Sequence, residues 1–128
     1  AIVSSNYYEN ITEGLVNGAK DKLDPSFHVY DYVVDGAWEL IYKINQLSSN
    51  DSIDKFIAIG VIVKGDTDHY EYISKSVADG LINLTIHKNI YIANCVLNVL
   101  NLKQANERVS ENKNKGSEAA SALNNLFL

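Results

Sequence analysis

Cysteine, proline and arginine are scarce in this chain of 128 residues, which contains one of each and no methionine. Because Cys95 has no second cysteine to pair with, an intrachain disulfide is excluded and a reducing, intracellular compartment is expected. A lone thiol in an apolar run is usually a small buried side chain and less often a catalytic nucleophile. Long hydrophobic runs are also missing, since the stretch at 56–63 is too short to span a bilayer, and no membrane partner is expected.

No secretory signal is visible at the start of the chain, which favours a cytoplasmic location. The chain nevertheless begins abruptly within an apolar run. A native start that carries an organellar targeting segment therefore stays open.

Positive charge is scarce as well. The chain has 11 lysine and arginine residues against 16 aspartate and glutamate residues, a formal net charge of −5. With no basic face evident, the composition argues against nucleic acid as a partner. Arg108 is the one arginine, and a planar guanidinium that grips phosphate with two hydrogen bonds is one reason to keep it. A surface ion pair with Glu107 or Glu111 is the alternative.

The length and an apolar fraction of 46% indicate one domain, residues 1–128, with one core. Strands are predicted at 1–5, 28–34, 56–63 and 90–97, and helices at 9–23, 38–48, 69–87, 101–111 and 115–126, with a kink before the last helix. Strands that alternate with helices pair in parallel through right-handed crossovers. The expected fold class is therefore α/β, a three-layer sandwich with a flavodoxin-like parallel sheet. Four strands make a small sheet, which favours one further N-terminal strand.

A ligand-binding rim is expected where the predicted strands end, because doubly wound sheets bind ligands at the carboxyl ends of their strands. The residues that directly follow the four predicted strands are 6–10, 35–39, 64–69 and 98–101. Tyr7, Trp38, Glu39 and His69 are therefore expected to converge although they lie far apart in the sequence. Glu39 also has a simpler interpretation, since the helix dipole favours a glutamate in the first turn of a helix.

The stretch GDTDHYEYI at residues 65–73 joins a small polar loop to a helix start. Asp68 and Glu71 fit a capping box, which needs no ligand. The N–H groups of the same helix start suit a phosphate, and His69 lies directly on it. The Walker A lysine pattern is absent, so the loop alone does not predict a nucleotide site. The cap and the phosphate site are compatible, and both are expected.

Several stretches together resemble the lumazine synthase (6,7-dimethyl-8-ribityllumazine synthase) family. GVIVKGDTDHYEYI (60–73) is similar to the family signature G-x-V-[IV]-[RK]-G-x-T-x-H-[FY]-[DE]-x-[VI], and VVDGAWEL (33–40) to its V-x-G-A-x-E-[IL]-P turn. QANER (104–108) and NKGSEAA (114–120) resemble its Q-A-x-x-R and N-K-G-x-[ED]-[AC]-A blocks, and residues 2–23 resemble its first strand and helix. The similarity covers nearly the whole chain at family-like spacing.

The resemblance implies a transferase of riboflavin biosynthesis. Such enzymes join 5-amino-6-(D-ribitylamino)uracil to L-3,4-dihydroxy-2-butanone 4-phosphate and release phosphate and water. The product, 6,7-dimethyl-8-ribityllumazine, is the precursor of riboflavin. The resemblance implies no metal and no organic cofactor. It also implies a pentamer with active sites between neighbouring subunits, sometimes built into a 60-subunit shell, and riboflavin synthase as a candidate protein partner.

Position by position, the resemblance implies that the ribitylaminouracil is bound by Tyr7, Ala37, Trp38, Glu39, Ile62, Val63, Asn94 and Lys115. Tyr7 would stack on the pyrimidine, and Glu39 would accept hydrogen bonds from ribityl hydroxyls. The phosphate would be held by Gly65, Asp66, Thr67 and Arg108. His69 would be the general acid/base, since an imidazole can both donate and accept protons near neutral pH. Arg108, from the neighbouring subunit, would also be catalytic because it stabilises the leaving phosphate.

The chain departs from the family pattern at several positions. Tyr8 replaces a frequent asparagine, Ile41 a proline, Asn94 an aromatic residue in many members and Cys95 a common glycine, while Asn98 and Val99 stand where Thr-Thr or Thr-Val is usual. Cys95 and Asn98 leave the shape of the fourth rim loop open. None of these changes removes a charged catalytic position.

Two other functions remain alternatives to the enzyme. One is a flavodoxin-like module that binds a flavin or another phosphorylated ligand without turnover. The other is a shell-forming homologue that has lost catalysis. The combination of His69, Glu39 and Arg108 favours the enzyme, because a pure binder would not need an imidazole there.

Overall fold

Strands and helices alternate along the chain in the computed structural model, which describes residues 1–128. In chain order they are β1 (Ile2–Ser5), α1 (Glu9–Lys22), β2 (Asp31–Val34), α2 (Ala37–Asn50), β3 (Lys55–Val63), α3 (His69–Lys88), β4 (Tyr91–Val99), α4 (Leu102–Glu107) and α5 (Lys115–Phe127). Every predicted strand and helix is present. None of the five helices combines the length and the hydropathy that a membrane span requires.

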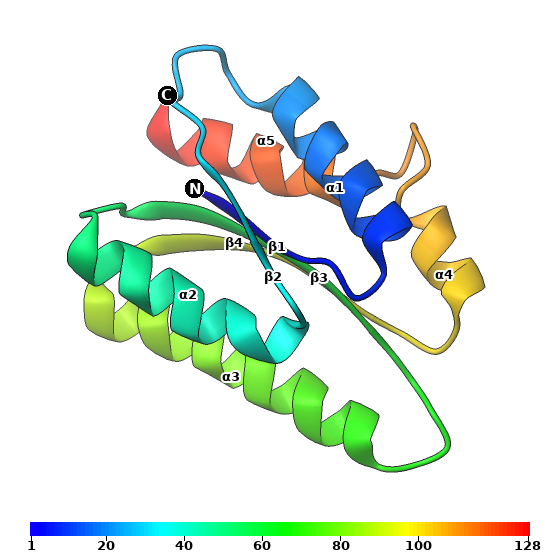
Figure 1. Ribbon diagram of the computed structural model, residues 1–128. Helices are drawn as coiled ribbons and strands as arrows, with labels where there is room; N and C mark the ends of the chain where they lie inside the picture. The colour runs from blue at the N-terminus through cyan, green and yellow to red at the C-terminus, as the bar shows by residue number, and fades with distance from the viewer.

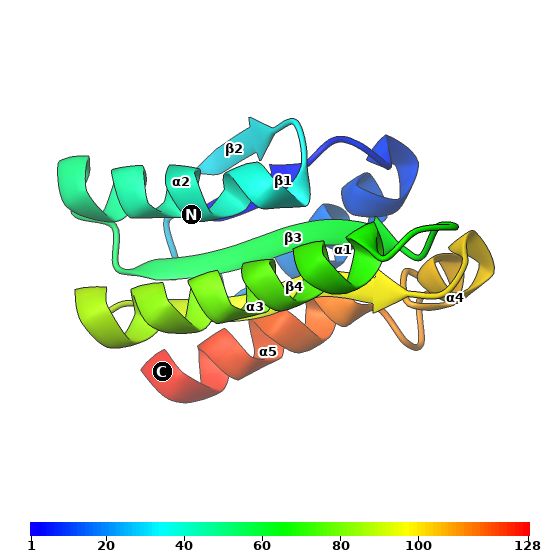
Figure 2. The ribbon, with the colours of Figure 1, turned by 90° about the horizontal axis from the view of Figure 1, so that it is seen from below.

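The four strands form one parallel sheet in the order β2-β1-β3-β4. Helices α1 and α5 cover one face of this sheet, and α2 and α3 cover the other (Figure 1). The predicted α/β fold class, a flavodoxin-like three-layer sandwich, is therefore confirmed. In Figure 2 the strands point toward the end of the molecule where α4 lies. Their carboxyl ends meet there, at the edge where parallel sheets bind ligands.

The central strand β3 explains the longest apolar run of the sequence. Phe56 and Ala58 point into the core beneath α2 and α3, whereas Ile57 and Ile59 point into the core beneath α1 and α5. None of these four side chains is more than 1% exposed. A strand that is buried on both faces needs apolar residues at successive positions, which is why no alternation is visible in its sequence.

Two predicted boundaries were wrong by more than two residues. Strand β2 begins at Asp31, three residues later than predicted, because Asp31 pairs with Ile2 and β1 offers no earlier partner. Helix α4 ends at Glu107, four residues earlier than predicted, and residues 108–113 form turns and bends before α5. The kink expected before the last helix is therefore a complete break between two helices.

Helix α5 lies close against α1 because Gly116 has no side chain. A Cβ atom at Gly116 would lie 1.9 Å from the carbonyl oxygen of Leu15. The Nδ2 of Asn114, just before α5, donates to the carbonyl oxygen of Gly14 in α1 (3.1 Å). Asn114 and Gly116 of the NKGSEAA block therefore hold α5 against α1.

Candidate functional site

The carboxyl ends of β1, β2 and β3 and the first turns of α2 and α3 enclose a pocket of about 290 Å³, here called the rim pocket. It is lined by Tyr7, Tyr8, Gly36, Ala37, Trp38, Glu39, Val61, Ile62, Val63, His69, Tyr70 and Ile73. The structure thus brings Tyr7, Trp38, Glu39 and His69 around one pocket, as the rim argument predicted. Three chain segments that are distant in sequence meet here, because three parallel strands end at the same edge.

The rim pocket has aromatic residues at its mouth and an apolar floor. Tyr7 and Trp38 are 72% and 61% exposed, whereas Ala37 and Ile62 are buried. The start of α2 approaches β3 closely at Gly60, where a Cβ atom would lie 3.6 Å from the Cβ of Ala37. Exposed aromatic faces, a buried apolar floor, one carboxylate and one imidazole suit a flat heterocycle that carries hydroxyl groups.

The predicted phosphate loop lies beside the rim pocket rather than in its lining. Gly65, Asp66 and Thr67 form the exposed connection between β3 and α3. The predicted capping box is wrong, because Asp68 has helical backbone angles (φ −73°, ψ 0°) and its side chain accepts no capping hydrogen bond. A capping box needs an extended residue at this position. Instead, the N–H of His69 donates to Thr67 Oγ1 (3.3 Å). The Asp68 carboxylate accepts no hydrogen bond from the first N–H groups of α3.

A second pocket, of about 430 Å³, lies beside β4 and α5 and is here called the edge pocket. It is lined by Tyr91, Ala93, Asn94, Cys95, Val96, Leu97, Asn98, Arg108, Lys115, Glu118, Ala119 and Ala122. Lys115 Nζ and Glu118 Oε2 pair at 3.0 Å across the first turn of α5. Three of the predicted site residues, Asn94, Arg108 and Lys115, therefore meet here and not at the rim.

The guanidinium of Arg108 is held by its own helix. Its Nη1 donates to the carbonyl oxygen of Gln104, one turn earlier (2.9 Å). Arg108 forms no ion pair with Glu107 or Glu111, so the surface-pair interpretation does not describe this structure. The remaining N–H groups of the guanidinium stay available to an anion in the edge pocket.

The two pockets share no lining residue. The rim pocket lies beyond the carboxyl ends of β2, β1 and β3, and the edge pocket follows β4, the edge strand at the other side of the sheet from β2. Within one chain, the structure therefore does not bring Arg108 or Lys115 to Tyr7, Glu39 and His69. No group of three or more histidine, cysteine, aspartate or glutamate side chains is arranged to hold a metal ion.

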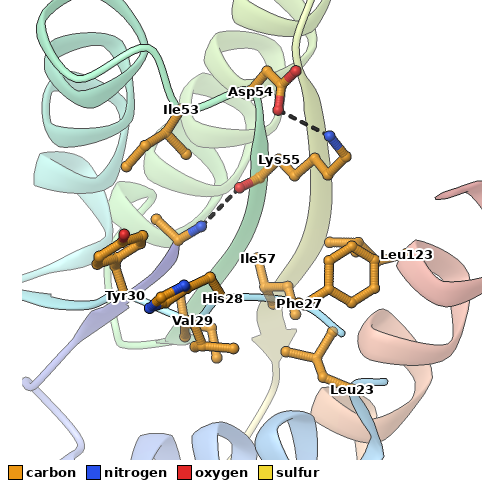
Figure 3. Close-up of a pocket in the computed structure, with 12 residues that line it drawn as sticks. Leu23, Phe27, His28, Val29, Tyr30, Ile53, Asp54, Lys55, Ile57 and Leu123 are labelled. Carbon is orange, nitrogen blue, oxygen red and sulfur yellow. Dashed lines mark hydrogen bonds and ion pairs between the residues drawn. The ribbon is translucent and has the colours of Figure 1, made fainter. Parts of the chain in front are cut away.

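A third cavity, of about 150 Å³, lies at the opposite end of the sheet (Figure 3). There the amino group of Ala1 donates to the Lys55 carbonyl oxygen (2.8 Å), and Lys55 Nζ pairs with Asp54 Oδ1 (3.0 Å). Most of its lining is apolar, including Phe27 and Leu123. It contains none of the predicted site residues and lies at the amino ends of the strands, where parallel sheets do not usually bind their ligands.

The model of the 6,7-dimethyl-8-ribityllumazine synthase family matches residues 1–127. The chain belongs to this family. Proteins with that name are 38% identical over 94% of this chain in Bartonella henselae, which is 81% of the relative, and 37% identical over 94% in Erythrobacter litoralis, which is 87% of the relative. A Zymomonas mobilis protein with the same name is 34% identical over 98% of this chain and 91% of its own length. The suspected resemblance to the lumazine synthase family is therefore confirmed.

The fourth rim loop, whose shape the departures from the lumazine synthase pattern left open, is held by local hydrogen bonds. Asn101 Oδ1 accepts from the N–H of Gln104 (2.9 Å), and Gln104 Oε1 accepts from the N–H of Leu100 (2.8 Å). Sequence reasoning missed this reciprocal cap, although an asparagine followed three residues later by a glutamine is a readable signal. Earlier along β4, Asn94 Oδ1 accepts a hydrogen bond from the N–H of Val96 (3.0 Å). Asn98 Nδ2 donates to the carbonyl oxygen of Val96 (3.2 Å).

Cys95, at a position that is a common glycine in lumazine synthases, is 3% exposed. Burial and, less strongly, the charge of Glu118 raise the pKa of this thiol to about 12, and the charge of Lys115 opposes the shift. A neutral thiol is a poor nucleophile. The expectation of a small buried side chain is therefore confirmed.

Ile41 replaces the proline of the lumazine synthase turn, and its side chain packs on α3. A Cβ atom at Gly80 would lie 2.9 Å from Ile41 Cδ1, so the absence of a side chain at Gly80 makes room for the isoleucine. Tyr70 and Ile73 line the rim pocket although sequence reasoning did not name them. Their signal is spacing, because they follow His69 by one and four residues on α3.

Proposed function

We propose that this chain is an active lumazine synthase. It joins 5-amino-6-(D-ribitylamino)uracil to L-3,4-dihydroxy-2-butanone 4-phosphate and forms 6,7-dimethyl-8-ribityllumazine, one phosphate and two waters. The observation that carries the proposal is the rim pocket, which is lined by six of the eight residues that the family resemblance assigns to the ribitylaminouracil, all except Asn94 and Lys115. The conclusion therefore rests on the arrangement of the site as well as on similarity of sequence.

The rim pocket would hold the pyrimidine by stacking and by hydrogen bonds. The Tyr7 ring offers the stacking face, and backbone groups of Ile62 and Val63 offer donors and acceptors to the uracil edge. The N–H groups of Ala37 and Trp38 lie in the first turn of α2, where helix N–H groups have no partner within the helix. Glu39, in the same turn, would accept hydrogen bonds from the ribityl hydroxyls.

The chemistry requires repeated proton transfers. The C5 amine of the pyrimidine attacks the ketone, and the first water leaves as an imine forms. A proton then leaves the carbon beside the C–O bond that breaks to release phosphate, and the resulting enol becomes a new ketone. The ribityl nitrogen attacks this ketone, and loss of the second water closes the ring. His69 at the start of α3 would carry these protons, and binding both reactants side by side would supply much of the rate.

The phosphate would lie between the loop of Gly65, Asp66 and Thr67 and the guanidinium of Arg108. Because Arg108 lines the edge pocket of its own chain, a neighbouring copy must supply it to the rim pocket. Lys115, which lines the same edge pocket, would come with it. Two halves of one site would thus meet across each subunit interface.

Head-to-tail contacts that join the edge pocket of one copy to the rim pocket of the next can close into a ring, and we propose the pentamer that the family resemblance implies. Large apolar side chains that no part of the chain covers support an interface. They are Trp38 and Tyr42 on α2 and Tyr72, Ile82 and Ile86 on α3. A cytoplasmic location, a 60-subunit shell and an association with riboflavin synthase stay predictions.

The test is an assay of lumazine formation, in which both substrates are supplied and the product is measured by its absorbance. Product that appears only when both substrates and the protein are present supports the enzyme. Binding of a flavin without turnover would favour the non-catalytic module, and a large assembly with neither property would favour the shell-forming homologue. The size of the oligomer is measured by sedimentation on the same protein. A monomer at micromolar concentration would contradict the shared site.

A further inference from the structure

Tyr8 is a departure from the lumazine synthase pattern, in which asparagine is frequent, and its ring packs on Tyr7. The two ring centroids lie 4.9 Å apart, and the ring planes meet at 71°, an edge-to-face arrangement. This is the only aromatic pair in the rim pocket. The exposed Tyr7 ring therefore has an aromatic neighbour that an asparagine could not provide.

The two tyrosines differ in how firmly the chain holds them. Tyr7 is 72% exposed, whereas Tyr8 is half-buried and packs against the core beneath α1 and α5. The Tyr8 carbonyl oxygen accepts hydrogen bonds from the N–H groups of Ile11 (3.1 Å) and Thr12 (3.0 Å), which fixes Tyr8 at the start of α1. The anchored ring is thus placed to limit the rotamers of the free ring.

We propose that Tyr8 is a positioning residue that holds the Tyr7 ring in the orientation that stacks on the pyrimidine. The inference rests on the proposed function, in which Tyr7 provides the stacking face. An exposed tyrosine without a neighbour samples several rotamers, and only a fraction of them binds the substrate productively. The apparent affinity falls by that fraction, so an anchor that preselects the productive rotamer lowers the Michaelis constant.

The test compares Tyr8→Leu with Tyr8→Phe. Leucine keeps apolar packing against the core but has no aromatic edge, whereas phenylalanine keeps the edge-to-face pair without the hydroxyl. We expect Tyr8→Leu to raise the KM for the ribitylaminouracil about 3- to 10-fold, the range of one edge-to-face pair. The KM for the butanone phosphate and kcat should stay the same. Tyr8→Phe should keep the wild-type KM for the ribitylaminouracil.

A double-mutant cycle with Tyr7→Ala separates positioning from simple loss of structure. In the Tyr7→Ala background, Tyr8→Leu should have no further effect on the KM, because no ring remains to be positioned. An equal effect in both backgrounds would overturn the inference, as would a Tyr8→Phe enzyme that behaves like Tyr8→Leu. Circular dichroism and oligomer size, measured on every variant, show that the compared chains are folded alike.

The cycle also separates this inference from the proposed function. If Tyr7→Ala raises the KM for the ribitylaminouracil and Tyr8→Leu does not, only the positioning role of Tyr8 is wrong. If Tyr7→Ala itself leaves that KM unchanged, the stacking role of Tyr7 is wrong and the positioning role falls with it.

Discussion

The rim pocket and the edge pocket lie on the same sheet but differ in chemistry and in origin. The rim pocket gathers three chain segments, and it combines aromatic rings and a buried floor with one carboxylate and one imidazole. The edge pocket lies along β4 and α5 with Arg108 at the end of α4, and it contains a guanidinium, an ammonium group and a carboxylate. The first suits a flat heterocycle and the second suits an anion, so each offers what the other lacks.

The position of β4 in the sheet explains this separation. Strand order β2-β1-β3-β4 puts β1 in contact with both β2 and β3, so the residues after these three strands converge. Strand β4 pairs with β3 on the side away from β1 and β2, and Arg108, at the end of the helix that follows β4, lines the edge pocket instead of the rim pocket. A reaction that needs both pockets must therefore combine two copies of the chain.

The test with the largest expected effect mixes two inactive chains, each with one damaged pocket. One carries Tyr7→Ala with Glu39→Gln, which damages the rim pocket, and the other carries Arg108→Ala, which damages the edge pocket. If sites are shared between head-to-tail neighbours, co-refolding equal amounts should leave roughly one quarter of the sites intact. Lumazine formation by the mixture measures this fraction.

Each inactive chain refolded alone is the control, and mass spectrometry must show that hybrid rings have formed. Activity no greater than the sum of the two separate chains would mean that the two pockets do not cooperate across an interface.

A second test removes the proton carrier from the rim pocket alone. His69→Ala should lower kcat by roughly 10- to 10³-fold, with less effect on either KM, because a proton shuttle acts mainly in the transition state. Steady-state kinetics across neutral pH provides the measurement. His87→Ala, an exposed histidine in the last turn of the same helix, is the matched control and should behave as wild type. Equal kcat values for both variants at every pH would remove His69 from the mechanism.

A third test alters the edge pocket without removing its charge. Arg108→Lys should raise the KM for the butanone phosphate about tenfold, because lysine keeps the positive charge but loses the planar fork. The KM for the ribitylaminouracil should change little. Lys103→Ala, an exposed position on α4, controls for general effects on that helix. If Arg108→Lys changes both Michaelis constants equally or neither, the assignment of the edge pocket to the phosphate fails.

The smallest effect on activity is expected at Cys95, which lines the edge pocket but is buried. Cys95→Ala should leave kcat and both Michaelis constants within about twofold, because a thiol with a pKa of about 12 is neutral during catalysis. In the wild-type chain, thiol-directed reagents at pH 8 should react at least about 100-fold more slowly than with free cysteine. Fast labelling of the folded protein would show that the edge pocket opens more widely than the structure shows.

The sequence was sufficient to predict the fold because each element carries its own periodicity. The apolar run in β3, for example, is typical of a strand that is buried on both faces, and the structure shows this burial. The residues around the rim pocket followed from one further rule, that the carboxyl ends of parallel strands share an edge. Tyr7, Glu39 and His69 could therefore be grouped without a structure.

What the sequence could not predict depends on local backbone angles and on strand order. The capping box at Asp68 failed because a residue pattern does not specify whether the N-cap residue is extended. The separation of Arg108 from the rim pocket depends on β4 being the edge strand beside β3, which alternation of strands and helices does not determine. The ring contact between Tyr7 and Tyr8 depends on side-chain rotamers, which a sequence does not show.

Both ends of the chain lie at the end of the molecule opposite the rim pocket (Figures 1 and 2). Ala1 is bonded to Lys55 at the start of β3, and the ring of Phe127 packs 5.8 Å from that of Tyr91 at the start of β4. A fluorescent protein or an affinity tag joined to Ala1 or Leu128 would therefore lie far from the place where the pyrimidine is proposed to bind.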